Sequence, residues 1–309
     1  MTSPSPSPSL PSIWTSTNLA ILKECPFKFK TAILDGWSLK HDPKIHLGAG
    51  GTFAAAIEVA RRAYYVNGQP EDIAVAEGAL VILKSDLAWG SDLPGRNRAK
   101  GLEGVIRAFL EYWTKWPFSA SAPIVLPSAQ GIEFSFAEEL PFPELDRPLF
   151  IGRADAILEQ RSGTWIVDEK TCSGFGPSWA DQWQLRSQFI GYSWAADRMG
   201  LSIRGTAVRG IAMLVAGPEF AEALNFMPHQ RLLNDWLDTT EETILLAKRF
   251  SEKNFWPKAL GEPCNAYGGC QFRNVCLSRF PQERLESDFE RSWYNPISRE
   301  RQETPWWEA

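Results

Sequence analysis

The stretch "LFIGRADAILEQRSGTWIVDEKTCSG", residues 149–174, contains two apolar runs that carry charged residues where core strands usually carry apolar ones. Both runs are rich in β-branched and aromatic residues and are separated by a turn signal, so they predict two adjacent β-strands. The first contains Asp155, and the second ends in Asp168, Glu169 and Lys170. Because successive side chains of a strand alternate faces, Asp168 and Lys170 share one face and Glu169 points to the other.

A two-residue loop at Arg161 and Ser162 would place Gln160 opposite Gly163 and, counting back, Asp155 opposite Asp168. A bulge at Gly163 would shift this register by one residue. Two facing carboxylates repel each other unless a cation lies between them. The hairpin therefore predicts a divalent metal site, and all-oxygen ligands suit Mg²⁺ or Mn²⁺ better than zinc.

Lys170 would stand beside that metal, where it could orient a water that attacks a phosphodiester and stabilise the charge that develops. The alternative is an edge hairpin with a solvated Asp–Lys pair. The apolar runs argue against it, because they place both strands within the core.

The order of predicted elements indicates an α/β protein with a mixed central sheet and flanking helices. Its core order is helix, three strands, helix, strand (αβββαβ), with helical additions at both ends. Periodicity and turn signals predict helices at 15–30, 50–68, 70–89, 96–116, 178–199 and 228–250, and strands at 122–127, 131–140, 149–160, 164–171 and 205–217. Ser178 is a plausible N-cap of the helix at 178–199 and Gly200 its end.

The predicted domain organisation is one domain with two tails. Residues 1–12 are a Ser/Pro repeat that is typical of a disordered tail, and residues 281–309 form a polar tail that contains Trp306 and Trp307. The domain between them, 13–280, has a helical part (50–118), a core with the candidate site (122–217), and a C-terminal helix with a Cys-rich segment (228–280). Whether the two tryptophans dock on the domain or on a partner stays open.

Charge excludes an overall basic protein but leaves DNA binding possible. The 32 basic and 37 acidic residues give a net charge of −5, yet enzymes that act on DNA often confine positive charge to one groove. Neither a signal peptide nor an apolar run of about 20 residues is present, so we expect a soluble, cytoplasmic protein without a membrane span. The three histidines, at 41, 46 and 229, lack ligand spacing.

Two further groups of residues are candidates for contact with DNA. Gln184, Gln188 and Tyr192 recur every four residues on the helix predicted at 178–199, although ordinary solvation explains Gln184 equally well. The basic segment "GRNRAK" supplies residues that could track phosphates beside Trp89, with a solvated loop as the alternative; they are Arg96, Arg98 and Lys100.

Three motifs together resemble the PD-(D/E)XK nuclease superfamily, and in particular its RecB-like and Cas4-like branch. They are "GRAD" with Asp155, "VDEKT" with Asp168 and Lys170, and "QFIGY" with Gln188 and Tyr192. The resemblance implies a restriction-endonuclease-like core and a Mg²⁺- or Mn²⁺-dependent DNA nuclease, of exonuclease type, in recombination, repair or phage DNA processing.

The same resemblance implies residue roles. Asp155 and Asp168 would hold the metal, Lys170 would be catalytic, and the backbone carbonyl of Glu169 would complete the metal shell. Gln188 and Tyr192 would contact DNA. Glu133, in "GIEFSF", matches an acid that family members often carry on the preceding strand.

One position departs from the family pattern. Many RecB-like members carry histidine in an early helix, as Gly-x-x-His-x-x-Leu-Glu, whereas this chain reads "GTFAAAIE" with Ala54 at that place. The mode of cleavage therefore stays open. So does the alternative of a catalytically degenerate DNA-binding module that works beside a helicase, an annealing protein or a single-strand-binding protein.

Four of the five cysteines form a separate candidate site. Five residues lie between successive members of Cys264, Cys270 and Cys276, which is not the spacing of a zinc ribbon, and Cys25 stands near the start. The family resemblance implies that these four bind a [4Fe-4S] cluster, with Zn²⁺ as the alternative ligand. Such a cluster would tie the two ends of the chain together. Buried free thiols are the simplest alternative, and this is the reading we favour for Cys172.

Overall fold

The computed structural model describes residues 10–40, 45–125, 130–266, 269–298 and 300–307. Most of the tail predicted at 1–12, together with His41, lies outside this described part. The chain divides into two compact units. Unit 1 comprises Met1–Asp42, Ala137–Gly152 and Arg231–Ala309, and unit 2 comprises Pro43–Phe136 and Arg153–Gln230.

A mixed β-sheet is the framework of the candidate site. Among the described residues it has seven strands, in the order β1-β5-β6-β7-β8, with β3 and β4 also paired to β5. β6 and β7 are parallel, whereas β5–β6 and β7–β8 are antiparallel. The strands are β1 (Ile13–Trp14), β3 (Ser121–Pro123), β4 (Ile132–Glu139), β5 (Leu149–Gln160), β6 (Gly163–Cys172), β7 (Gly205–Ala212) and β8 (Glu219–Phe226).

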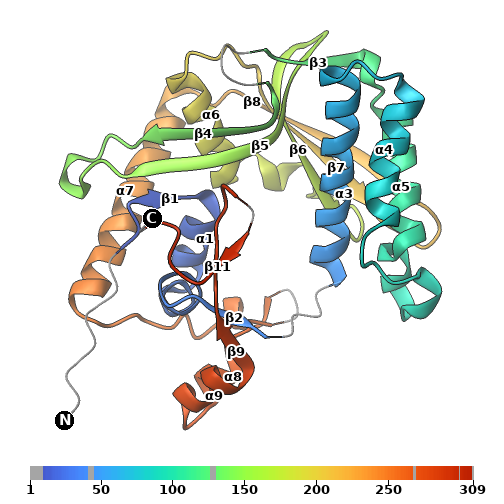
Figure 1. The fold of residues 1–309 in the computed structure, drawn as a ribbon. Helices are drawn as coiled ribbons and strands as arrows, with labels where there is room; N and C mark the ends of the chain where they lie inside the picture. Colours follow the sequence, from blue (N-terminus) through green and yellow to red (C-terminus); the bar gives the residue numbers. More distant parts are fainter. Residues whose placement is uncertain (1–9, 41–44, 126–129, 267–268, 299, 308–309) are drawn as a thin grey trace. The chain divides into compact units, whose positions relative to one another are not determined.

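Helices cover both faces of the sheet in unit 2 (Figure 1). One face carries α3 (Ile45–Arg61), α4 (Glu71–Leu83) and α5 (Leu102–Lys115), whose buried apolar residues pack with Ile211 of β7. The other face carries α6 (Ser187–Arg198), where Phe189 packs with Val208 of β7. The expected α/β class, with a mixed central sheet and flanking helices, is confirmed.

Unit 1 has its own core. One buried apolar cluster contains Trp37, Phe272 and Phe289. A second contains Ile151, Trp293 and Trp306. Trp306 thus packs on the chain itself. The elements of unit 1 besides β1 are α1 (Ser16–Glu24), α2 (Pro26–Phe29), a π-helix (Lys30–Leu34), β2 (Trp37–Leu39), α7 (Gln230–Glu252), α8 (Arg273–Leu277), α9 (Pro281–Asp288), β9 (Phe289–Arg291), β10 (Trp293–Tyr294) and β11 (Arg301–Gln302).

Three helix starts differ from the prediction by five residues or more. The helix expected at 50–68 begins earlier, at Ile45. The helix expected at 178–199 begins only at Ser187, because Trp179 and Trp183 are buried against β7 and β8, and a 3-10 turn (Asp181–Trp183) brings them there. The N-cap position of α6 is occupied by Arg186, which has an extended backbone with φ −71° and ψ 116°. Ser178, the predicted N-cap, is therefore not the N-cap of this helix. The helix expected at 96–116 begins at Leu102, after a 3-10 turn (Gly95–Lys100). β8 was not expected at all.

Candidate active site

The β5–β6 hairpin brings the two predicted carboxylates together. Gln160 pairs with Gly163 and Ala156 with Val167, so the predicted register holds through the paired part of the hairpin. Asp155 and Asp168 are the next residues on the two strands, just beyond the last pair, and the negative charge of Asp168 acts on Asp155. The backbone N–H of Glu169 donates a 2.8 Å hydrogen bond to Asp155 Oδ2. This bond fixes the first carboxylate against the backbone of the second strand.

Alternation along β6 sorts its charged residues as predicted. Asp168 and Lys170 lie on the face covered by α6, where Gln188 Nε2 donates to Asp168 Oδ1 at 3.1 Å. Glu169 points to the opposite face, toward α3 and α5, and its carboxylate meets Arg61. The end of β6 therefore contributes charged side chains to both faces of the sheet: Asp168 and Lys170 to the α6 side, and Glu169 to the side of α3 and α5.

Both aspartates have environments that oppose ionisation. Burial raises the pKa of Asp168, which is 2% exposed, although Lys170 beside it acts in the opposite direction. The pKa of Asp155 is raised well above its ordinary value by desolvation and then by the negative charges of Asp168 and Glu169. Two such groups in contact favour binding of a positive charge.

Lys170 supplies one positive charge at this point. Its ammonium forms an ion pair with Asp168, and its Nζ lies 5.9 Å from the centroid of the Phe189 ring. Burial lowers the pKa of Lys170, but the two aspartates outweigh this effect and raise it above its ordinary value. With its side chain 32% exposed, Lys170 is a protonated group that can be reached from solvent.

Gln188 and Tyr192 belong to a chain of hydrogen bonds that supports Asp168. Gln188 Nε2 lies 3.3 Å from the hydroxyl oxygen of Tyr192, and that hydroxyl donates to the backbone carbonyl of Arg153 at 2.9 Å. Both side chains therefore have partners inside the protein. Gln184, predicted to share their helical stripe, lies before α6 and is exposed, with its amide 3.4 Å from Asp181 Oδ1.

Glu133 stands at an unusual backbone position near these residues. It is the second residue of β4 and has a φ of 49°, a backbone conformation that residues other than glycine rarely adopt, and its carboxylate forms a 2.9 Å ion pair with Arg153 Nε. Its negative charge contributes to the raised pKa of Asp155, so the predicted acid does lie within electrostatic range of the pair.

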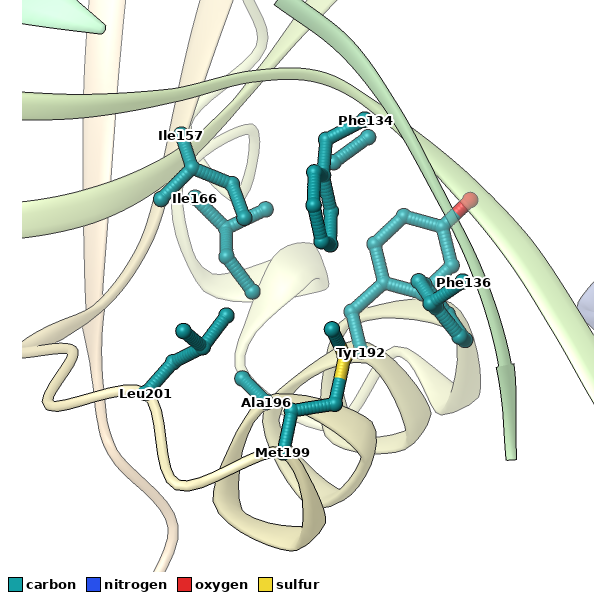
Figure 2. Close-up of a pocket in the computed structure, with 9 residues that line it drawn as sticks. Phe134, Phe136, Ile157, Ile166, Tyr192, Ala196, Met199 and Leu201 are labelled. Atoms are coloured by element: carbon teal, nitrogen blue, oxygen red, sulfur yellow. The ribbon is translucent and has the colours of Figure 1, made fainter. Parts of the chain in front are cut away.

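A small apolar cavity lies behind Tyr192 (Figure 2). Its volume is about 10 Å³, and its lining includes Phe134, Ile166 and Met199. A space of this size holds at most one water, and an apolar lining gives such a water no partners. The cavity is thus part of the packing that holds the Tyr192 ring, and substrate has no room there.

The donor set fits a hard divalent cation. Asp168 Oδ2 is buried, and it faces the positively charged ammonium of Lys170, with which it forms an ion pair. Asp155 adds a second, partly accessible carboxylate. The described part of the chain contains no group of three or more His, Cys, Asp or Glu side chains that could hold a metal. Mg²⁺ does not need one, because it usually keeps several waters and takes one or two carboxylates.

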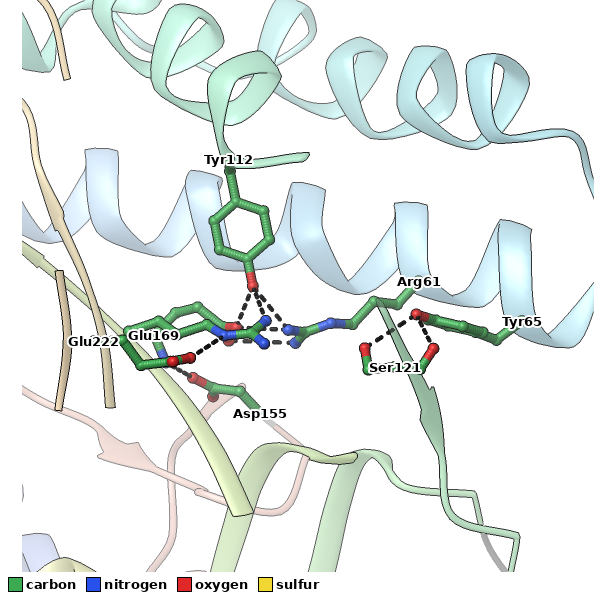
Figure 3. Close-up of polar contacts among 8 residues, drawn as sticks. Arg61, Tyr65, Tyr112, Ser121, Asp155, Glu169 and Glu222 are labelled. Atoms are coloured by element: carbon green, nitrogen blue, oxygen red, sulfur yellow. Dashed lines mark hydrogen bonds and ion pairs between the residues drawn. The ribbon is translucent and has the colours of Figure 1, made fainter. Parts of the chain in front are cut away.

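The sequence did not predict the partners of the Glu169 side chain. Arg61 of α3, Tyr112 of α5 and Arg209 of β7 form a buried polar network with it (Figure 3). One signal was present: Arg61 and Arg209 interrupt segments whose other inward residues are apolar, such as Ile57 and Ile211. A charge inside an apolar stripe needs a buried partner.

The basic segment predicted to contact DNA ends next to the C-terminal end of β6. Lys100 Nζ donates to Ser173 Oγ at 3.1 Å, just after β6 ends. Arg96 and Arg98 are exposed, and Trp89 is 56% exposed. The structure therefore places the Lys100 ammonium beside Ser173, which follows Lys170 by three residues in the chain.

The four predicted cluster cysteines all lie in unit 1. Cys25 is buried and the other three are partly buried, all as free thiols. Burial raises the pKa of Cys276, and the thiols of Cys270, Cys25 and Cys264 add to this effect, while Lys258 opposes it. Cys270 N–H also donates to the carbonyl of Cys264 at 3.0 Å. Among the described residues, these thiols are not arranged as a group of three or more that could hold a metal ion.

Comparisons with known proteins place this geometry in context. The family model of the PD-(D/E)XK nuclease superfamily matches residues 13–277. A comparison with curated proteins found no match. Among solved structures, an Eubacterium rectale protein provisionally described as an exonuclease aligns with a TM-score of 0.46 and 12% identity, over 87% of this chain and 93% of that chain. SSO0001 aligns with a TM-score of 0.30 and 16% identity, over 64% and 74%. In the described residues, no helix is long and apolar enough to span a membrane.

Proposed function

Because the chain belongs to the PD-(D/E)XK nuclease superfamily, we propose that it is a metal-dependent DNA nuclease that acts as an exonuclease in recombination, repair or phage DNA processing. The observation that carries this proposal is the pair of facing carboxylates, Asp155 and Asp168, with the Lys170 ammonium beside them. That arrangement is costly for a fold and useful for phosphodiester hydrolysis.

Asp155 and Asp168 would hold Mg²⁺ or Mn²⁺, and the backbone carbonyl of Glu169 would be a further ligand. When bound, such an ion lowers the pKa of a coordinated water and neutralises charge on a phosphate. Lys170 keeps its proton in this environment, so its role would be to orient the attacking water and stabilise the negative charge that develops.

The neighbouring polar residues would position these groups. Gln188 holds one Asp168 oxygen, and the bond from Tyr192 to the Arg153 carbonyl ties α6 to β5. We propose that Gln188 and Tyr192 contact DNA by exchanging these bonds for bonds to the substrate. Glu133, paired with Arg153, would add negative charge near the metal.

DNA would approach along the basic segment that ends at Lys100. Arg96 and Arg98 are free to contact phosphates, and the exposed Trp89 offers a surface on which a base can stack. Helicases, annealing proteins and single-strand-binding proteins in the cytoplasm of a bacterial or phage-infected cell would be the protein partners.

For unit 1 we propose a [4Fe-4S] cluster on Cys25, Cys264, Cys270 and Cys276, with Zn²⁺ as the alternative. The thiols of Cys270, Cys25 and Cys264 each help to raise the pKa of Cys276, which supports the proximity of these three to it. Protein purified without oxygen should be brown, absorb broadly near ~400 nm and contain iron. Colourless protein with stoichiometric zinc would replace the cluster with the alternative.

A nuclease assay tests the proposed function directly. The purified chain should degrade end-labelled DNA in Mg²⁺ or Mn²⁺ and lose this activity in EDTA. Asp168→Ala and Lys170→Ala should each lower kcat by at least about 100-fold, the scale for loss of one electrostatic contact to the transition state. Arg231→Ala, at an exposed position of α7, is the matched control and should retain full activity.

Substrate form separates the remaining possibilities. Linear single-stranded, linear double-stranded and closed circular DNA should be compared, because only an endonuclease cleaves the circle. One competing function is a DNA-binding module that does not cleave. It is supported by Ala54, which stands where many RecB-like nucleases carry a histidine. DNA binding that survives Asp155→Ala and Asp168→Ala, with no cleavage by the wild type in any metal, would establish that function and overturn ours.

A further inference from the structure

A buried polar network lies on the face of β6 that is opposite to the proposed metal site (Figure 3). Its members are Arg61, Tyr112, Glu169 and Arg209, which come from α3, α5, β6 and β7. Arg61 is 2% exposed and Arg209 is 4% exposed. Three elements besides β6 thus contribute side chains to the surroundings of Glu169, which lies between Asp168 and Lys170 in the sequence.

Arg61 grips the Glu169 carboxylate with both ends of its guanidinium. Nη2 lies 2.5 Å from Oε1, and Nη1 lies 3.2 Å from Oε2. This two-point contact restrains rotation of the carboxylate as well as its position. Burial alone would lower the pKa of Arg61, but the Glu169 charge outweighs burial and raises it. Burial would likewise raise the pKa of Glu169, but Arg61 outweighs it and the pKa is lowered.

Tyr112 uses the whole bonding capacity of its hydroxyl within the network. It donates to Glu169 Oε1 at 2.7 Å, and it accepts from Arg61 Nη2 at 3.0 Å and from Arg209 Nη1 at 2.9 Å. A phenol has one donor and two acceptor sites, so none is left over. Arg209 Nε also donates to Glu222 Oε1 at 3.2 Å, which balances the two arginines with two carboxylates.

The network reaches the proposed metal site through one peptide group. The same Glu169 whose side chain is held by Arg61 donates its backbone N–H to Asp155 Oδ2 at 2.8 Å. Asp168 and Lys170 flank it on the strand. Any rotation of this residue would break the bond to Asp155 and move both neighbouring side chains.

We infer that Arg61, Tyr112 and Arg209 are positioning residues: by immobilising Glu169 from behind, they hold Asp155 and Asp168 at the spacing that a divalent cation requires. The inference rests on the proposed function and assigns to the Glu169 side chain a role beyond that of its backbone. A buried ion pair seldom stabilises a fold more than apolar residues of equal volume would. The Arg61–Glu169 pair has a different use, because it fixes the positions of the residues at the end of β6.

The test measures metal binding and catalysis separately in folded protein. Mn²⁺ affinity is measured by the loss of the free-ion signal in electron paramagnetic resonance, and kcat and KM are measured on labelled DNA. The variants are Arg61→Met, Tyr112→Phe, which removes one oxygen atom, and the double variant Arg61→Met/Glu169→Met, which replaces the pair with apolar side chains. Ile82→Ala, a buried position of α4 outside the network, controls for lost stability.

We expect Arg61→Met and Tyr112→Phe to weaken Mn²⁺ binding and lower kcat by roughly 10- to 100-fold, as loss of a metal ligand's supporting partner does, with little change in the KM for DNA. The double variant should regain thermal stability without regaining Mn²⁺ affinity. If Arg61→Met does not fold, Tyr112→Phe and the double variant decide by the same criteria.

Different results would contradict the positioning role and the proposed nuclease function. Wild-type affinity and kcat in the folded network variants, or an equal loss in Ile82→Ala at matched stability, would overturn the positioning role and leave the nuclease intact. A wild-type protein that neither binds Mn²⁺ nor cleaves DNA would instead overturn the proposed function.

Discussion

Tyr192 supports the site from within the protein core. Its ring packs beside the small apolar cavity, and its hydroxyl lies between Gln188 and the Arg153 carbonyl. Burial, followed by the charge of Asp168, raises the pKa of Tyr192 to about 12. The hydroxyl therefore remains a hydrogen-bond donor at every pH at which the protein is used.

This raised pKa has a consequence for stability in alkali. The ordinary pKa of tyrosine is 10.0, so between pH 10 and pH 12 the unfolded chain loses this proton and the folded chain keeps it. The stabilising contribution is complete below pH 10 and declines as the pH rises toward 12. We expect Tyr192→Phe to abolish this part of the alkaline loss, roughly 2 kcal/mol at pH 12.

The measurement is urea unfolding of both proteins at a series of pH values from neutral to alkaline. Tyr294→Phe is the control, because Tyr294 is 50% exposed. Identical alkaline profiles for wild type and Tyr192→Phe would contradict the assignment.

At this scale the sequence predicted the carboxylates and missed their support. Asp155, Asp168 and Lys170 were predictable because alternation and a two-residue turn act over a few positions. The contact between Arg61 and Glu169 joins residues that are 108 positions apart. No local pattern encodes that distance; only the packing of α3 on the sheet creates it.

Among the elements, α3 and α4 approach each other through a glycine. A Cβ at Gly78 would lie 2.7 Å from the carbonyl oxygen of Ala56 and 2.4 Å from Cζ of Phe109. The close contact helps to set the position of α3, which carries Arg61. Helix propensity alone would favour alanine at this position by about 1 kcal/mol.

We therefore expect two glycine-to-alanine substitutions to change the free energy of unfolding in opposite directions. Gly78→Ala should lower the free energy of unfolding by roughly 1–3 kcal/mol, because the added methyl overpacks the contact. Gly51→Ala, at an exposed site of α3 with no atom near the added Cβ, should raise it by up to about 1 kcal/mol. Urea unfolding of both variants checks this, and stabilisation by Gly78→Ala would show that α4 can move away.

The sheet and most helices were predictable, and their boundaries were less so. The β5–β6 hairpin follows from alternation and turn chemistry. The late start of α6 does not, because the burial of Trp179 and Trp183 overrides a sequence that would otherwise continue the helix. Similarly, Gly101 precedes α5 and leaves the arginines before it in a 3-10 turn.

For the whole molecule, net charge sets the conditions for binding DNA. At −5 the chain repels a polyanion on average, so attraction must come from a local group of cations. The exposed Arg96 and Arg98 are such a group. DNA binding should therefore be weak at high salt.

We expect Arg96→Ala/Arg98→Ala to weaken binding of single-stranded DNA and to reduce the slope of log K against log salt by about 1.4, at about 0.7 for each lost phosphate contact. Fluorescence anisotropy in EDTA, which prevents cleavage, measures both quantities. Arg231→Ala should leave the slope unchanged, since this residue is exposed on α7 and pairs with Asp235. An unchanged slope in the double variant would place the DNA elsewhere.

The sequence separations within the site also bear on the order in which the chain folds. The hairpin that pairs the two aspartates closes through a two-residue turn, whereas Arg61 must close a loop of more than a hundred residues. Short loops close sooner and at a smaller entropic cost. We expect the two acids to meet while α3 is still undocked, so the newly made chain acquires an ordered centre only at a late step of folding.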